Sequence, residues 1–229
     1  MLIRLKFSKQ GQVKFVGHLD TVRLFQRAIK VVNLPVAYSL GFNPHSLVYF
    51  ALPLSVGVSS VGEYMDIITK ENIAVYKVKE SLNDVLTKDI KILDAFLIDE
   101  NTPSLMSLVS AADYRINLPK EYFPSLNKEE IEQKINQEEI LVTKKTKKGL
   151  QQIDIRPMIL SHKIDNLDDA LCIDIKVHAG SQSNLNPELF LTAITNSNLD
   201  NKLYYIERQE LYTFEQDKCI PLFKFRRKQ

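Results

Sequence analysis

The chain has 229 residues, of which 45% are hydrophobic and 25% are charged, a composition typical of a globular protein with one large domain or two small ones. Its 30 basic residues are nearly balanced by 28 acidic ones, so the net charge of +2 does not by itself indicate a nucleic-acid-binding protein. The two cysteines, Cys172 and Cys219, cannot build an iron–sulfur cluster or a thiolate zinc site within one chain, so we expect no cofactor and no metal.

The first hundred residues predict the element order β-α-β-β-α-β. Ile3, Leu5 and Phe7 alternate with polar residues, which indicates a half-buried strand. This start lacks the uninterrupted apolar core of a signal peptide, so the cytoplasm is the expected location. Apolar residues at helical spacing then predict a helix that begins at His18. The remaining expected elements are strands at 47–52 and 63–69, a helix at 73–86 and a strand at 91–98.

The second half predicts a similar series after a linker that begins at Pro103. Asn186 and Pro187 are typical of the cap and the first position of a helix. The expected elements are a strand at 113–118, a helix at 128–137, a hairpin of 140–145 with 150–160, a strand at 171–177, a helix at 187–195 and a strand at 204–214.

Both halves therefore predict the split βαβ arrangement, in which two helices cover one face of an antiparallel sheet and the other face stays open. We expect an α+β protein of tandem ferredoxin-like (βαββαβ) units. The N-terminal unit would comprise residues 1–102, and the C-terminal unit, with its basic tail, residues 103–229. Because the sequence shows no repeat, this expectation rests on the order of the elements alone.

A long uncharged segment follows the first helix. Residues 31–62 contain no Lys, Arg, Asp or Glu, but prolines and glycines interrupt the run. A membrane helix needs about 20 apolar residues without such breaks, so we expect loops and no membrane contact. The segment is a candidate functional site or docking surface.

Two histidines mark the candidate site. His18 begins the predicted helix, and His45 ends a turn that starts at Gly41. One interpretation is an acid–base pair, beside an anion site formed by Arg23, Arg27 and the backbone N–H groups of Gly41 and Asn43. The alternative, which is the commoner role of such residues, is that His18 caps the helix and His45 stabilises the turn.

Basic residues gather in places suited to phosphate contacts. The residues concerned are Lys144, Lys145, Lys147 and Lys148 around the hairpin turn, Arg156 on the following strand, and Arg226 and Arg227 in the tail. They predict a nucleic-acid-binding surface, whereas the alternative interpretation is a solvated sheet face and a soluble hairpin tip.

Several motifs together resemble one known family. They are FVGHLD at 15–20, AYSLGFNPH at 37–45 and IDIRP at 153–157. The combination is similar to the radical-SAM-linked protein family, a domain of unassigned function fused to, or encoded beside, cobalamin-domain radical SAM proteins. Two departures are Gly17, where serine is usual, and Ser46 with Leu47, where proline and lysine are typical. The resemblance implies a radical SAM protein as partner.

We therefore expect an RNA-binding accessory protein that presents its substrate to a separate radical SAM partner. One alternative is a metal-independent ribonuclease that uses His18 and His45 as acid and base. Another is a protein-interaction module that docks through residues 31–62.

Overall fold

The first half of the chain forms an antiparallel sheet with two helices on one face. The computed structural model describes residues 1–146, 149–195, 203–216 and 218–226. Its first elements are β1 (Leu2–Lys9), the 3-10 helix η1 (Gly11–Phe15), α1 (His18–Val31), β2 (Val48–Phe50), β3 (Ser59–Ile68), α2 (Val75–Val85) and β4 (Ile90–Ile98). The strands pair in the order β4-β1-β3-β2, and every pair is antiparallel.

The second half has a second set of strands in a corresponding order. Its elements are α3 (Leu105–Leu108), β5 (Ala111–Pro119), α4 (Lys128–Ile135), β6 (Leu141–Thr146), β7 (Gly149–Asp154), η2 (Arg156–Met158), β8 (Ile159–Asn166), β9 (Ala170–His178), α5 (Pro187–Thr195), β10 (Tyr205–Glu215) and β11 (Lys218–Pro221). The order is β10-β5-β9-β8, again antiparallel. β6 and β7 form a separate two-stranded hairpin.

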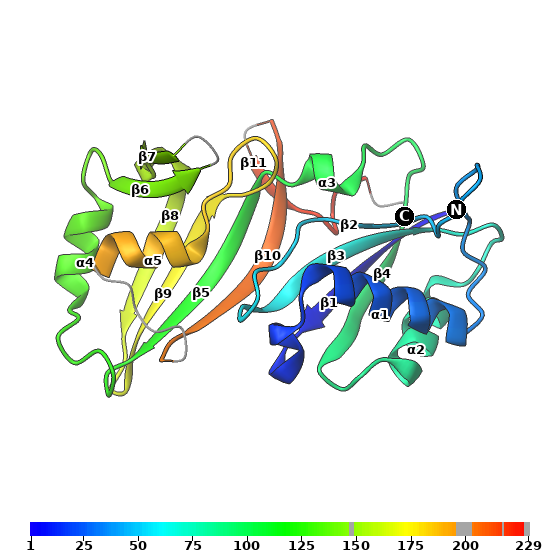
Figure 1. The fold of residues 1–229 in the computed structure, drawn as a ribbon, viewed down its shortest axis with the longest axis horizontal. Coiled ribbons are helices and arrows are strands. Elements are labelled where there is room, and N and C mark those ends of the chain that lie inside the picture. Colours follow the sequence, from blue (N-terminus) through cyan, green and yellow to red (C-terminus); the bar gives the residue numbers. More distant parts are fainter. Residues whose placement is uncertain (147–148, 196–202, 217, 227–229) are drawn as a thin grey trace.

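The two halves are joined into one sheet, where the sequence predicted a sheet in each unit. β3 and β10 run parallel and pair at Ser59 with Glu207 and at Ser60 with Arg208. Within the described residues this junction, which we call the seam, completes a nine-stranded sheet (Figure 1). The protein is thus a mixed α+β fold on a large, mostly antiparallel sheet.

Each half packs its own helices against the sheet. Phe25 of α1 and Leu82 of α2 are buried against β1, β3 and β4. Ile131 of α4 and Phe190 of α5 are buried with the apolar residues of β5, β8 and β9. Figure 1 shows α5 and α1 in front of the strands, and we call this face the helix side. No helix among the described residues is long and apolar enough to cross a bilayer.

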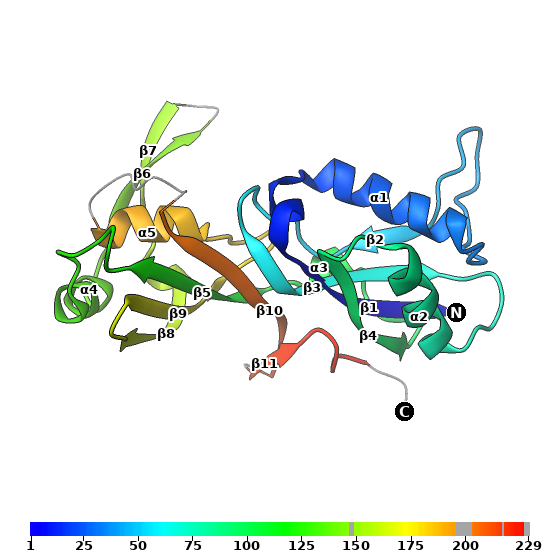
Figure 2. The same cartoon turned by 90° about the horizontal axis from the view of Figure 1, so that it is seen from below.

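The opposite face of the first half is covered, where the sequence predicted an open face. The segment 218–226, which we call the strap, crosses this face (Figure 2). Arg4 is fully buried there, pairs with both carboxylate oxygens of Asp66 at 2.8 and 2.9 Å, and donates to the carbonyl oxygen of Leu222 at 2.9 Å. Phe223 stacks on Phe96. Polar residues of β1 and β3 are therefore internal rather than solvated.

Candidate functional site

The seam is the part of the molecule where polar and aromatic side chains of both halves converge. On the helix side, the connection 51–58 between β2 and β3 runs between α5 and α1 (Figure 1). Its Gly57 N–H donates to the carbonyl oxygen of Lys14 at 2.9 Å, which ties it to η1. Residues from η1, β3, β10 and α5 therefore meet around this connection.

Arg208 anchors the connection 51–58 to the strands of the sheet. Its guanidinium is buried and donates to both carboxylate oxygens of Glu63, at 3.0 and 3.1 Å, and to the carbonyl oxygen of Pro53 at 3.2 Å. It also donates to the hydroxyl of Tyr114. Burial alone would lower the pKa of Arg208, but Glu63 and Tyr114 outweigh burial and raise it. Arg208 therefore stays charged and holds β3, β5 and the connection together.

Lys9 and His18 lie beside the same carboxylate. Lys9 Nζ donates to the carbonyl oxygen of Val16 at 2.5 Å, and burial lowers the pKa of Lys9 despite the opposing charge of Glu63. The ring of His18 packs at right angles to Phe50, and partial burial lowers the pKa of His18, with Glu63 opposing the shift and Lys9 adding to it. The cavity between these groups is about 10 Å³. That volume is enough for about one water molecule, so this cluster does not hold a substrate.

A larger cavity, which we call the seam pocket, opens next to it. Its volume is about 220 Å³, and Lys14, Phe15, Glu188 and Tyr205 are among the residues that line it. Lys14 Nζ lies 5.1 Å from the ring centroid of Phe15 and 5.3 Å from that of Tyr205. Both rings are 58% exposed. Exposed aromatic rings can stack on a planar group, and the ammonium group beside them can contact an anion such as a phosphate.

The structure does not bring His18 and His45 together. His18 is the first residue of α1, whereas the loop that carries His45 lies beyond the last residue of this helix (Figure 1). The 14 residues of α1 correspond to about 20 Å. The predicted acid–base pair and its shared anion pocket are therefore not formed, because His18 lies at the N-terminal end of α1 and the loop extends from beyond its C-terminal end.

The predicted anion-binding residues do not converge either. Arg23 is exposed and forms an ion pair with Asp20 of the same helix at 2.8 Å. Arg27 is exposed on α1, and Gly41 and Asn43 are exposed in the loop beyond this helix. These four residues are therefore spread along one side of the molecule.

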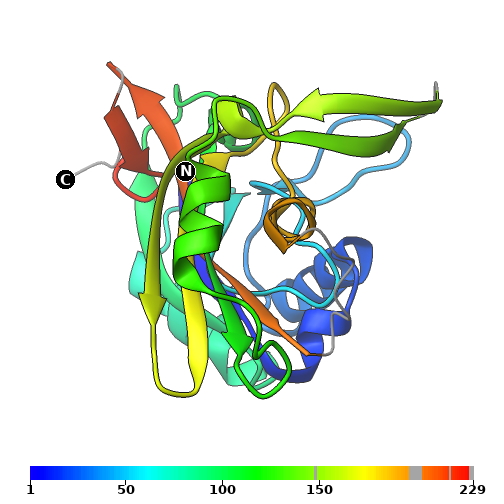
Figure 3. The same ribbon diagram turned by 90° about the vertical axis from the view of Figure 1, so that its left-hand side faces the viewer.

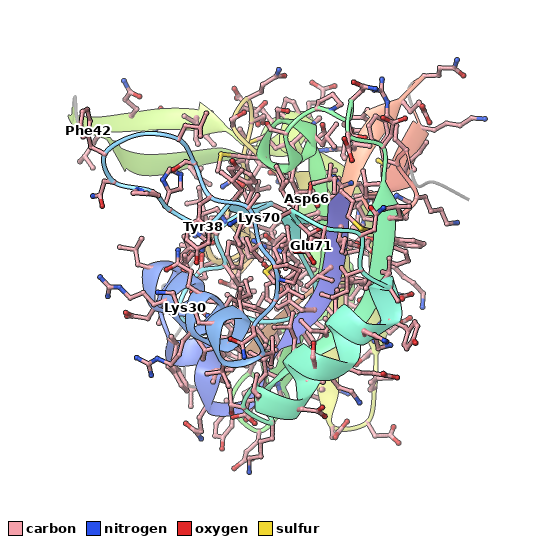
Figure 4. All side chains as sticks on the ribbon, turned by 90° about the vertical axis from the view of Figure 1, so that its right-hand side faces the viewer. Lys30, Tyr38, Phe42, Asp66, Lys70 and Glu71 are labelled. Atoms are coloured by element: carbon pink, nitrogen blue, oxygen red, sulfur yellow. The ribbon has the colours of Figure 1, made fainter. Side chains whose placement is uncertain are left out.

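The loop that carries His45 forms an arm, which comprises residues 37–47. Leu47 N–H donates to the carbonyl oxygen of Ala37. Ser39 N–H donates to the carbonyl oxygen of His45, His45 N–H donates to Ser39 Oγ, and Ser39 Oγ lies 2.8 Å from His45 Nδ1, so these contacts close the arm. Figure 4 shows Phe42 at the far end and Tyr38 beside Lys70 near the base. Leu40 and Phe42 are fully exposed. The contact of His45 is thus a structural one that shapes the arm.

The predicted nucleic-acid-binding residues divide between two sides of the sheet. The β6–β7 hairpin and the arm project on the helix side, whereas β11 lies on the other side (Figure 3). Arg156 donates to the carbonyl oxygen of Ile159, and Arg226 to that of Asn101. The side chains of Lys144 and Lys145, and all of Lys147, Lys148 and Arg227, lie outside the described residues.

The helix-free face of the second half is charged and open, but its charges are paired. Arg115 donates to both carboxylate oxygens of Asp174, at 2.8 and 3.0 Å, and Lys176 lies 3.6 Å from Asp113. These pairs cross neighbouring strands around a depression of about 400 Å³. Because each of these two cations already has a carboxylate partner, this face is poorly suited to phosphate contacts.

Groups that ligate metal ions are dispersed in the described part of the chain. Cys172 and Cys219 are both free, and burial raises the pKa of each thiol. Within residues 1–146, 149–195, 203–216 and 218–226, no three His, Cys, Asp or Glu side chains are placed to hold one ion. These ranges therefore offer no donor set on which to build a metal centre.

Comparison with known proteins identifies a family. No curated protein matches the chain. A crystal structure of a Cbf5-Nop10-Gar1 complex aligns with a TM-score of 0.46 and 11% identity, over 94% of this chain and 50% of that one. A dye-decolorizing protein from V. cholerae aligns with a TM-score of 0.22 and 9% identity, over 90% of each chain. The chain thus spans half the length of the first of these. Residues 2–187 match a family described as an uncharacterized protein conserved in bacteria, DUF2344, and the chain belongs to this family.

Proposed function

We propose that this protein binds single-stranded RNA in the seam pocket and acts as an accessory protein for a separate enzyme. The observation that carries the proposal is the placement of Lys14 between the exposed rings of Phe15 and Tyr205. An aromatic side chain that stacks on an unpaired base contributes about 1–3 kcal/mol. A lysine beside it adds a phosphate contact, so one nucleotide can be held at both its base and its backbone.

Further basic residues on the helix side extend the proposed surface. Arg27 and Lys30 are exposed on α1, and the β6–β7 hairpin projects on the same side (Figure 2). We propose that the lysines at the hairpin turn contact phosphates that flank the bound nucleotide. Because phosphate contacts position the strand without reading its sequence, they would add affinity and salt dependence but little specificity.

We also propose a fold for each half of the chain and a class of partner enzyme. We interpret the two halves as tandem ferredoxin-like units, a view supported by the pairing orders β4-β1-β3-β2 and β10-β5-β9-β8. A boundary near residue 102 stays a prediction. The resemblance to radical-SAM-linked proteins supports a radical SAM protein as the enzyme that receives the RNA.

A fluorescence anisotropy titration with a labelled single-stranded RNA 12-mer tests the proposal. Replacing Tyr205 with alanine removes one stacking platform of about 1–3 kcal/mol, so the dissociation constant should rise about 5- to 150-fold. The matched control is Tyr76→Ala on α2, because Tyr76 is 60% exposed and lies outside the seam. Equal affinities for the wild type and both variants would contradict the proposal.

A second candidate function is a protein-interaction module. It is favoured by Leu40 and Phe42, which are fully exposed at the end of an arm without charged residues. A large apolar side chain contributes about 1.5–3 kcal/mol when it is buried, so these two residues could anchor a partner. In that case binding of the partner protein would be lost when Leu40 and Phe42 are replaced with serine. It would survive Tyr205→Ala.

A further inference from the structure

We infer that the seam pocket selects guanine, because Glu188 is placed to accept hydrogen bonds from a base that lies against Phe15 and Tyr205. This inference rests on the proposed RNA-binding function and goes beyond it, since stacking and phosphate contacts do not distinguish the bases. It names the nucleotide that the pocket would hold and the side chain that would read it.

The position of Glu188 is fixed by the start of α5. Its N–H donates to Asn186 Oδ1 at 2.7 Å, and its carbonyl oxygen accepts from Thr192 Oγ1 at 3.0 Å. Because both contacts involve the backbone of Glu188, they fix its place at the start of α5 and leave its carboxylate free. Glu188 lines the same cavity as Lys14, Phe15 and Tyr205.

The carboxylate of Glu188 lacks a partner in the described part of the protein. It makes no hydrogen bond there, and no lysine or arginine nitrogen of the described residues lies within 4.0 Å of it. Lys14, the nearby cation of the pocket, instead lies over the two aromatic rings. A half-buried carboxylate and an ammonium group in one cavity are therefore both available to a ligand.

Guanine is the base whose edge fits a carboxylate best. Its N1–H and its N2 amino group are adjacent donors that can meet both carboxylate oxygens. Adenine and cytosine place a ring acceptor beside their amino group, which repels a carboxylate. Uracil places its single N–H between two carbonyl oxygens. A bidentate pair of this kind typically gives about 1–3 kcal/mol of discrimination between bases.

Glu188 also has a simpler explanation. An acidic residue in the first turn of a helix is stabilised by the helix dipole, and Glu188 occupies that turn of α5. This explanation predicts that its replacement changes stability slightly and leaves base preference unchanged. The guanine inference predicts the opposite pattern, so binding measurements separate the two.

The experiment compares GMP, AMP, CMP and UMP as ligands of the full chain by isothermal titration calorimetry. The wild type should bind GMP about 5- to 150-fold more tightly than the other three. Glu188→Gln should reduce this preference to below about 3-fold, because an amide offers a donor where guanine also has one. Glu188→Asp, which keeps the charge but shortens the side chain, should fall between the two. Glu80→Gln on α2, an exposed position outside the seam, is the matched control and should keep the preference.

Each outcome is decisive. A GMP preference that Glu188→Gln abolishes and Glu80→Gln preserves supports the inference. A preference that survives Glu188→Gln overturns it, as does equal binding of all four nucleotides. If the wild type shows no base preference while Tyr205→Ala still weakens RNA binding, the guanine inference fails and the proposed function stands. If neither nucleotides nor RNA bind, both fail. Circular dichroism and thermal melting establish that each variant is folded.

Discussion

Arg208 is the single residue on which most of the seam depends. Its guanidinium is buried, and its partners come from β3, β5 and the connection 51–58. Removing one member of a buried ion pair leaves the other charge without compensation and typically costs about 3–5 kcal/mol. We therefore expect Arg208→Met to lower the free energy of unfolding by about this amount.

Urea denaturation of four proteins measures this coupling. The set is the wild type, Arg208→Met, Glu63→Gln and the double variant, and we expect the double variant to lose less stability than the sum of the two single losses. Arg23→Met is the control, because the Arg23–Asp20 pair is exposed and such pairs contribute only about 0–1 kcal/mol. Equal losses for Arg208→Met and Arg23→Met would show that the seam does not depend on the buried pair.

His18 gives a prediction about pH. Partial burial lowers its pKa in the folded protein below the usual value near 6.5. As the pH falls below about 6.5, the unfolded chain therefore takes up this proton before the folded protein does. The contribution of His18 to stability is present above that pH and is lost on acidification.

Comparison with His18→Gln isolates this effect. The free energy of unfolding of the wild type minus that of His18→Gln should be larger at pH 8 than at pH 5. Urea denaturation at the two pH values measures it, and other titrating groups cancel in the difference. A difference that grows on acidification would mean that Glu63 stabilises the charged form of His18 by more than burial destabilises it.

At the scale of elements, the pairing of β3 with β10 depends on a glycine. A Cβ atom on Gly62 would lie 2.4 Å from the carbonyl oxygen of Gln209 and 2.7 Å from Cα of Glu210, both of them backbone atoms. Gly62→Ala should therefore force the two strands apart and destabilise the protein by about 1–3 kcal/mol. Gly17→Ala is a matched control, because a Cβ atom there has nothing within 4 Å. Thermal melting distinguishes them, and equal melting temperatures would contradict the close approach.

At the same scale, the order of the main strands and helices could be predicted from the sequence. The break between β7 and β8, and the strand β11, could not. The segment 150–160 reads as one apolar-rich strand, yet the structure divides it into β7, η2 and the first residues of β8. Pro157 explains the break, since proline in η2 cannot donate to a sheet. β11 follows β10 without a marked hydrophobic alternation of its own. Its pairing is a tertiary contact that local patterns do not encode.

The candidate site could be predicted only in part. The sequence singled out His18, which does lie beside Glu63 and Lys9, but the pairing of His18 with His45 required distance information that spacing lacks. The seam pocket was missed because Lys14, Glu188 and Tyr205 are far apart in the sequence. The adjacent Lys14 and Phe15, and the doublet of Tyr204 and Tyr205, were the available signals, and neither is specific.

At the scale of the whole molecule, the two sides of the sheet differ in what they offer a partner. The arm and the β6–β7 hairpin project on the helix side (Figure 3), and residues of η1 and α5 on that side line the seam pocket. The other side is covered by the strap in the first half and carries paired charges in the second. An RNA strand that contacts the lysine and the exposed rings of the seam pocket would therefore lie on the helix side.

Photo-crosslinking tests this placement most directly. A single-stranded RNA that contains guanosine and photoreactive 4-thiouridine would be irradiated with the full chain, and the crosslinked peptides would be mapped by mass spectrometry. We expect crosslinks in the peptide that carries Phe15 and in the peptide that carries Tyr205. The crosslink to the second peptide should be lost in the Tyr205→Ala variant. Crosslinks confined to the helix-free face around Lys176, or none at low salt, would contradict RNA binding at the seam pocket.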